Sequence, residues 1–224
     1  MKYSHVLFDA DETLFSFNAF AGLKNMFANY NIDFSEADYA HYQAVNKPLW
    51  IAYQNHDISA SELQVTRFSE WAKRLGVPAQ RLNDAFLAAM AEICLPLPGA
   101  VELLNKLKPH AKLGIITNGF TQLQARRLEH TGLKDMFDWL VISEQVGVAK
   151  PAAEIFQHTF ALMGNPAKEH ILMVGDTAAS DILGGQNVGI DTCWLQHPGA
   201  LLPDGIKPTY HVTQLKQLQR ILGL

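Results

Sequence analysis

Residues 5–13 of the chain read HVLFDADET, a short apolar run followed by two aspartates. Near-continuous apolar runs of this length are typical of strands that are covered on both faces of a sheet. Similar runs occur at residues 112–116, 139–142, 170–174 and 192–195, and a sixth strand is expected at 210–212. Helical patterns lie between them, at residues 101–107, 123–128 and 155–160. Strands that alternate with helices in this way predict an α/β fold with a parallel sheet.

The spacing of these runs indicates an inserted domain. Asp9 and Thr117 are 108 residues apart, whereas 33 residues separate Thr117 from Lys150. A strand–helix–strand unit needs only about 30 residues, so roughly 75 residues are inserted after the first strand. We therefore expect residues 1–16 and 96–224 to form the sheet domain and residues 17–95 to form a second domain.

The insert is predicted to be helical throughout, because apolar residues recur in it at helical spacing. Four helices are expected, packed as a bundle with short connections. One of them carries the stripe Val65, Phe68, Ala72 and Leu75, and Gly76 is expected to end it.

Composition limits the possible functions. The chain has 224 residues, and a formal net charge of −4 argues against a polymeric nucleic acid or an anionic membrane surface as a partner. Two cysteines do not make a disulfide framework, which favours a reducing compartment. No apolar run approaches the ~20 residues of a membrane-spanning helix. We expect a soluble, cytoplasmic protein with a small-molecule partner.

Polar residues that can carry chemistry follow four of the predicted strands. They are Asp9 and Asp11, Thr117 and Asn118, Lys150, and Asp176 with Asp181. Each group alone could cap a helix or form a turn. Because parallel strands present their carboxyl ends at one edge of the sheet, together they predict a common pocket.

The crowded carboxylates predict a magnesium site. Like charges in one cleft oppose each other's ionisation, and a divalent cation with oxygen ligands relieves that conflict. Asp176 is expected to hold Mg²⁺, and Asp181 to orient Lys150 or a metal-bound water.

A site with a metal, an ammonium and a strand-end carboxylate is suited to phosphoryl transfer. Asp9 is predicted to be the nucleophile that forms an aspartyl-phosphate. Asp11 is predicted to protonate the leaving alkoxide and later to deprotonate water. Thr117, backbone N–H groups beside it and Lys150 would stabilise the phosphate oxygens.

The four motifs resemble the signature motifs of the haloacid dehalogenase (HAD) superfamily. They read Asp9-x-Asp11-x-Thr13, Thr117-Asn118-Gly119, Lys150-Pro151 and Gly175-Asp176-x4-Asp181. The resemblance implies a Rossmann-like core, with residues 17–95 as a C1-type cap that governs substrate specificity. It further implies that Mg²⁺ is bound by Asp9, Asp176 and the backbone carbonyl of Asp11, and that Asn118 belongs to the phosphate-binding motif. An acid at position 11 favours a phosphatase over a dehalogenase.

Longer stretches, residues 42–50 and residues 91–94 running into 96–99, resemble the bacterial pyrimidine 5′-nucleotidases of this superfamily. Such enzymes act on dUMP, dTMP and UMP. A nucleoside needs aromatic faces and amide hydrogen bonds, which Asn46, Lys47 and Trp50 could supply. For each of these residues taken alone, ordinary helix surface or cap core is favoured over ligand contact. The alternatives are a phosphatase for a sugar phosphate or a phosphoglycolate-like metabolite, a phosphomutase, a dehalogenase and a non-catalytic receiver-like domain.

Overall fold

The computed structural model describes all 224 residues, which divide into two compact units. The sheet unit contains residues 1–16, 95–119 and 131–224. The helical unit contains residues 17–94 and 120–130.

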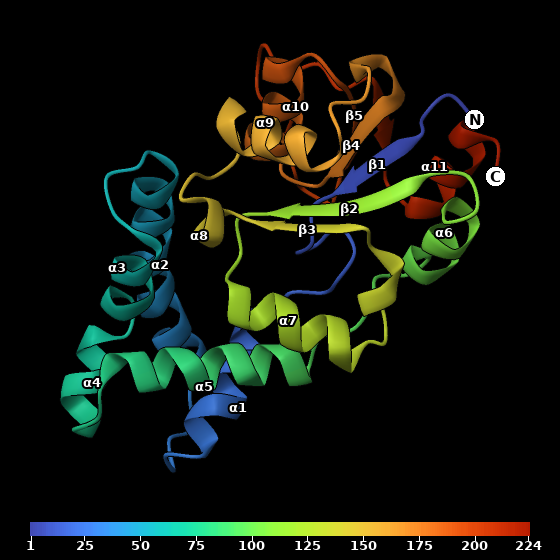
Figure 1. The fold of residues 1–224 in the computed structure, drawn as a ribbon. Coiled ribbons are helices and arrows are strands. Elements are labelled where there is room, and N and C mark those ends of the chain that lie inside the picture. Colours follow the sequence, from blue (N-terminus) through green and yellow to red (C-terminus); the bar gives the residue numbers. More distant parts are fainter. The chain divides into compact units, whose positions relative to one another are not determined.

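The sheet unit is built on one six-stranded sheet in which every pair of neighbours is parallel. The strand order is β3-β2-β1-β4-β5-β6 (Figure 1). The strands are β1 (His5–Phe8), β2 (Lys112–Thr117), β3 (Trp139–Ile142), β4 (Ile171–Gly175), β5 (Asp191–Leu195) and β6 (Tyr210–Val212). The predicted α/β fold with a parallel sheet is confirmed, including the strand at residues 210–212.

Short helical segments lie between most of these strands and after the last one. The α-helices of the unit are α6 (Ala100–Leu107), α8 (Ser143–Val146), α9 (Ala153–Leu162), α10 (Leu183–Val188) and α11 (Leu215–Leu222). Two 3-10 turns, η1 (Lys134–Met136) and η2 (Lys168–His170), precede β3 and β4. A π-helical turn, η3 (Ala178–Ile182), follows β4. Helices α9 and α10 pack together over one face of the sheet (Figure 1).

The core of the sheet unit follows from strand periodicity. Leu7 of β1 and Met173 of β4 are fully buried in a cluster with Ile155 and Phe156 of α9. Val6 and Phe8 are also fully buried. Because side chains alternate along a strand, they point to the face opposite Leu7. A strand buried on both faces has no polar position to alternate with, which explains the unbroken apolar run.

The helical unit contains one helix more than predicted in the insert. Five helices lie between residues 17 and 94: α1 (Ala19–Ala28), α2 (Glu36–Gln54), α3 (Ala60–Thr66), α4 (Ser69–Leu75) and α5 (Ala79–Glu92). The expected count of four is wrong because the stripe from Val65 to Leu75 is divided at Phe68, whose backbone is not helical (φ −111°, ψ 3°). At the break, the Ser69 hydroxyl donates to the Val65 carbonyl, and Arg67 turns inward to bond Asn83. The expected end at Gly76 is confirmed, since Gly76 caps α4 with φ +66°.

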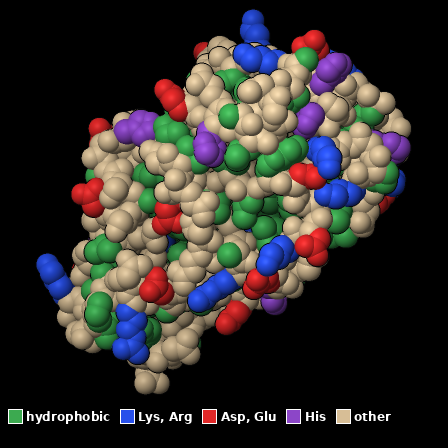
Figure 2. Space-filling view, in the orientation of Figure 1, with side chains coloured by type: hydrophobic (Ala, Val, Ile, Leu, Met, Phe, Trp, Pro, Cys, Tyr) green, Lys and Arg blue, Asp and Glu red, His purple; other side chains and the backbone are tan.

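Helix α7 (Thr121–His130) also belongs to the helical unit. It packs against α5, although residues 120–130 lie outside the predicted insert. None of the helices combines the length and the apolar character that crossing a membrane requires. On the face in Figure 2, Lys and Arg side chains lie interspersed with Asp and Glu side chains.

Candidate active site

The site forms where the strand order reverses, between β1 and β4. Asp9 directly follows β1 and Asp176 directly follows β4, and these two strands are neighbours in the middle of the sheet. The backbone N–H of Asp9 donates to the Val174 carbonyl at 2.9 Å, which continues the ladder to the last residue before the loop. Crevices at such reversal points are the usual ligand sites of open parallel sheets.

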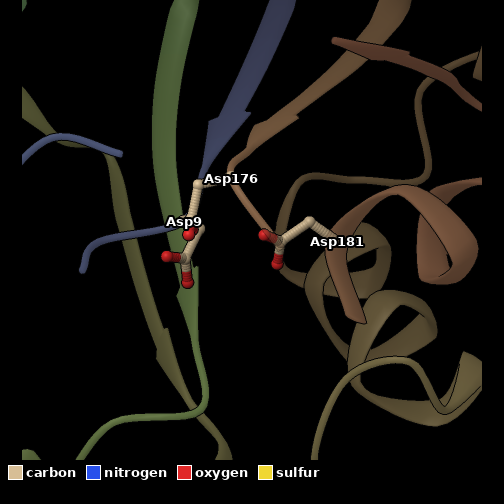
Figure 3. Close-up of side chains that lie close together, drawn as sticks. All are labelled: Asp9, Asp176 and Asp181. Carbon is tan, nitrogen blue, oxygen red and sulfur yellow. The ribbon is translucent and has the colours of Figure 1, made fainter. Parts of the chain in front are cut away.

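Three carboxylates converge at this position. Oxygens of Asp9, Asp176 and Asp181 all lie within 4.8 Å of one another. Figure 3 shows the three side chains close together, with Asp181 reaching in from the turn that follows β4. Residues that are far apart in the sequence therefore place several acidic groups in one small volume.

Lys150 is the cation of this cluster. Its side chain is 1% exposed, and its ammonium donates to Asp9 Oδ1 at 2.6 Å and to Asp181 Oδ1 at 2.7 Å. Its third hydrogen bond goes to the Ile116 carbonyl in β2, at 2.7 Å. All three N–H donors of the ammonium are used, so the group is held in one orientation.

Asn118 holds the backbone of Lys150. Its amide nitrogen donates to the Lys150 carbonyl at 2.9 Å, and its amide oxygen accepts from the Lys150 N–H at 2.8 Å. The side chain of Asn118 is therefore used within the protein, so a phosphate would be bound by the Thr117 hydroxyl and by backbone groups of this motif and not by the Asn118 amide. The neighbouring Thr117 hydroxyl accepts the N–H of Gly119 at 3.0 Å.

Asp181 is held by hydrogen bonds to both of its oxygens. Oδ1 accepts from Lys150 and, at 3.3 Å, from the Ser180 hydroxyl, while Oδ2 accepts the Thr177 N–H at 3.0 Å. Gly175 makes room for it, because a Cβ at that position would lie 2.2 Å from Asp181 Oδ2. A carboxylate with both oxygens occupied is suited to orienting Lys150.

Asp176 accepts two long hydrogen bonds from side chains. Its Oδ1 accepts from the Thr13 hydroxyl and its Oδ2 from the Thr177 hydroxyl, both at 3.3 Å. Thr13 belongs to the first motif, which predicts no role for it, and Thr177 is not among the predicted site residues. The spacing of the first motif, in which Thr13 lies two residues after Asp11, could have indicated Thr13. The only signal for Thr177 in the sequence is its position directly after Asp176.

Asp11 lies in a tight turn beyond β1. It forms an isolated parallel bridge with Phe15, and the N–H of Glu12 donates to the Phe15 carbonyl at 2.7 Å. The side chain of Asp11 is half-buried, and its charge raises the pKa of Asp9. The structure thus places Asp11 at the same edge of the sheet, within electrostatic reach of Asp9.

The carboxylates shift each other's protonation. Burial, and then the charges of Asp181, Asp176 and Asp11, raise the pKa of Asp9 well above its usual value, although Lys150 opposes this. Burial and the charge of Asp181 raise the pKa of Asp176 to about 7. Burial disfavours the charged form of Lys150, but Asp181 and Asp9 outweigh it and raise the pKa of the ammonium.

These residues fit a divalent cation. The three clustered carboxylates carry more negative charge than one ammonium can balance, and carboxylate oxygens are the ligands that Mg²⁺ prefers. Asp181 accepts three hydrogen bonds, from Lys150, Ser180 and Thr177, whereas Asp9 and Asp176 accept fewer from side chains and so keep more oxygen lone pairs for a metal. The donor set therefore agrees with a magnesium site at Asp9 and Asp176.

The candidate base-binding residues lie in the helical unit, on α2. Asn46 and Trp50 are half-buried and Lys47 is exposed. The Trp50 ring lies 5.2 Å from that of Phe120 and 5.9 Å from that of Tyr53. Phe120 was missed by the sequence analysis, although it directly follows the Thr117-Asn118-Gly119 motif. A substrate-binding role for Asn46, Lys47 and Trp50 remains a prediction.

Comparisons with known proteins agree with the resemblance noted in the sequence. Residues 3–189 match the family model described as haloacid dehalogenase-like hydrolase. The chain is 56% identical over 222 residues to the pyrimidine 5′-nucleotidase YjjG of Escherichia coli (strain K12), covering 99% of each chain. It is 34% identical to the pyrimidine 5′-nucleotidase PynA of Streptococcus pneumoniae, covering 97% of this chain and 94% of the relative.

A solved structure has a similar fold. The HAD-hydrolase YfnB of Bacillus subtilis, described as bound to magnesium, matches with a TM-score of 0.88 and 31% identity. The match covers 100% of both chains.

Proposed function

Because the chain belongs to the haloacid dehalogenase-like hydrolases, we propose that it is a Mg²⁺-dependent phosphomonoesterase, and specifically a pyrimidine 5′-nucleotidase. Membership in the family makes it a hydrolase. The observation that carries the phosphatase proposal is the Lys150 ammonium, which is buried between Asp9 and Asp181 at one end of a three-carboxylate cluster. Such a group is preorganised for an anion that arrives beside the nucleophile.

In the first step, a carboxylate oxygen of Asp9 attacks the phosphorus of the substrate. The bond from phosphorus to the ester oxygen breaks, and Asp11 donates a proton to that leaving oxygen. The products of the step are a free alcohol and a phosphate group bonded to Asp9. Thr117 and backbone N–H groups of the Thr117 motif bind the non-bridging oxygens. The Lys150 ammonium, which bonds Asp9 itself, places its positive charge beside them.

In the second step, a water molecule gives a proton to Asp11 and attacks the phosphorus. The bond from phosphorus to Asp9 breaks, which releases inorganic phosphate and restores both aspartates. Asp181 keeps Lys150 in place throughout, and Asn118 holds the main chain of Lys150. Asp9, Asp176 and the backbone carbonyl of Asp11 would hold Mg²⁺, which would supply positive charge that keeps Asp9 ionised and offsets the charge of the phosphate.

The substrate proposal rests on the relatives. Two proteins that match nearly the whole chain are named pyrimidine 5′-nucleotidases, so dUMP, dTMP and UMP are the proposed substrates. We place recognition of the base on the helical unit as a C1-type cap (residues 17–95), with Asn46, Lys47 and Trp50 as the contacts. An amide and an aromatic face are the groups that a pyrimidine requires. A cytoplasmic location fits the two buried free cysteines, Cys94 and Cys193.

Hydrolysis of p-nitrophenyl phosphate tests the reaction class. We expect activity with magnesium chloride, none with EDTA, and none in Asp9→Asn. A folded Asp9→Asn protein, checked by circular dichroism, with wild-type turnover would remove Asp9 from its role. Asp138→Asn is a matched control, since Asp138 is a partly buried carboxylate bonded to Lys112 at 3.0 Å, and we expect full activity from it.

A substrate panel tests the specificity. We expect dUMP, dTMP and UMP to have higher kcat/KM values than purine nucleotides, ribose 5-phosphate and phosphoglycolate. Equal values across the panel would contradict the nucleotidase proposal while leaving the phosphatase proposal intact. Transfer of the phosphate to a second sugar hydroxyl, in place of release to water, would indicate a phosphomutase.

A further inference from the structure

Two ring N–H groups from the end of β5 reach the loops that carry the acidic residues. The indole Nε1 of Trp194 donates to the main-chain carbonyl of Asp176 at 2.7 Å. The Nε2 of His197 lies 2.5 Å from the main-chain carbonyl of Glu12. Because a carbonyl oxygen only accepts, Nε2 carries the proton in this hydrogen bond. One four-residue segment therefore contacts both the loop that carries Asp176 and the turn that carries Asp11.

The His197 bond is made to a strained turn. Glu12 lies between Asp11 and Thr13 and has φ +55°, a left-handed conformation that is unfavourable for a non-glycine residue. Hydrogen bonds within the turn run from Glu12 to Phe15, and from Leu14 and Phe15 to Ala10. His197 adds a bond from 185 residues away in the sequence. Strained conformations persist where the surroundings hold them, and His197 is part of that support.

The Trp194 bond fixes the other loop. Trp194 is 2% exposed and packs with Ala178 and Ile182 of the π-helical turn η3. Its ring stacks on that of His211 at 5.0 Å. Packing therefore fixes the position of the Trp194 ring, and the hydrogen bond from its Nε1 orients the peptide group of Asp176.

We infer that Trp194 and His197 are positioning residues, which hold the main chain at Asp176 and Glu12 so that the carboxylates of Asp176 and Asp11 meet around the substrate phosphate. Neither ring touches the reacting atoms in this arrangement. The inference rests on the proposed function, because it assigns these residues a part in that reaction. Partners that orient metal-binding groups typically change metal affinity or activity by about 10–100-fold when they are removed.

The surroundings of His197 make it suitable for substitution. Its ring is half-buried and lines a cavity of about 530 Å³, together with Glu12, Leu97, Glu102 and Lys216. A shorter or differently shaped side chain at position 197 would border this cavity and would not disturb the core. Trp194, in contrast, is buried in the core. His197 variants are therefore the primary test, and Trp194→Phe, which keeps the ring packing and removes the N–H, is the second.

The experiment compares His197→Leu, His197→Gln and His170→Leu. Leu removes the hydrogen bond, and Gln retains an N–H donor at a similar reach. His170 is the matched control, because its Nδ1 also bonds a main-chain carbonyl, that of Lys2 at 3.1 Å, beside the amino end of β4. Each variant is assayed with p-nitrophenyl phosphate for kcat, KM and the magnesium concentration that gives half-maximal activity. The increase in unfolding temperature on adding magnesium chloride is measured without substrate.

We expect His197→Leu to lower kcat by about tenfold, with a smaller change in KM, and to raise the half-maximal magnesium concentration by a similar factor. Its unfolding temperature should rise less with magnesium than that of the wild type. His197→Gln should keep most of the wild-type kcat and most of the wild-type magnesium response. Trp194→Phe should resemble His197→Leu, and His170→Leu should match the wild type.

Wild-type kcat and magnesium response in His197→Leu would overturn the inference. Equal losses in His197→Gln and His197→Leu would also overturn it, since the bond would then not be the cause. If His197→Leu does not fold, His197→Gln and Trp194→Phe are compared with the wild type. Wild-type kcat and magnesium response in Trp194→Phe would then overturn the inference. Failure of the proposed function has a different signature, the lack of magnesium-dependent hydrolysis in the wild type itself.

Discussion

Replacing Lys150 with methionine tests whether the buried ammonium holds the acidic cluster together. The side chain is 1% exposed, and methionine has a similar volume without the three hydrogen bonds to Asp9, Asp181 and the Ile116 carbonyl. Removing one partner of a buried ion pair typically costs roughly 3–5 kcal/mol, because a charge is left without compensation. Asp9 can take up a proton to reduce this cost, so we expect about 3 kcal/mol at neutral pH.

The assay is equilibrium unfolding in urea without magnesium, followed by circular dichroism. Lys112→Met is the control, since Lys112 pairs with Asp138 at 3.0 Å but is 65% exposed. An exposed pair contributes at most about 1 kcal/mol. The loss in Lys150→Met should be larger at pH 8 than at pH 5, where the carboxylates around it can be protonated.

A double variant separates the ion pair from general packing. If the Lys150–Asp181 contact carries the stability, Lys150→Met should cost at least about 1 kcal/mol less in an Asp181→Asn background than in the wild type. A loss in Lys150→Met no larger than that in Lys112→Met would refute the reasoning. Strict additivity in the double variant would refute it as well.

Three further predictions concern neighbouring groups. Without magnesium, the protein should be less stable at pH 8 than at pH 5. The pKa of Asp176 is raised to about 7, so at pH 5 the folded state holds a proton that the unfolded chain has released. The free energy of unfolding therefore falls as the pH rises through this range. Thermal unfolding in EDTA measures this, and magnesium should stabilise the protein more at pH 8; a higher unfolding temperature at pH 8 in EDTA would contradict the shift. Gly175→Ala should displace Asp181, since the new Cβ would lie 2.2 Å from its Oδ2, and should lower kcat by at least tenfold; wild-type kcat would show that the site can make room. Asn118→Ala should remove both hydrogen bonds to the Lys150 backbone and cost about 1–3 kcal/mol in urea unfolding, with kcat reduced; unchanged stability would mean that water replaces the amide.

Local patterns predicted the sheet well because its strands are covered on both faces. The apolar runs match β1, β3 and the other strands to within one residue at either end. The insert was harder to predict, because α3 and α4 have only 7 residues each and a stripe with helical spacing continues across the break between them at Phe68. That break depends on Arg67 and Ser69 finding partners at Asn83 and Val65. Neither contact leaves a periodic signal.

The sequence by itself determined which residues stand at the carboxyl ends of the strands, because a strand's end and the polar residue after it are local features. Asp9, Thr117 and Asp176 were found in this way. Only the tertiary structure decided how they are held: Lys150 buried between two acids, the Asn118 amide turned onto the backbone of Lys150, and ring donors from Trp194 and His197 on the acidic loops. These contacts join residues from 18 to 185 positions apart. The physical reason is that such contacts arise from strand register and loop packing, which the order of residues along the chain does not display.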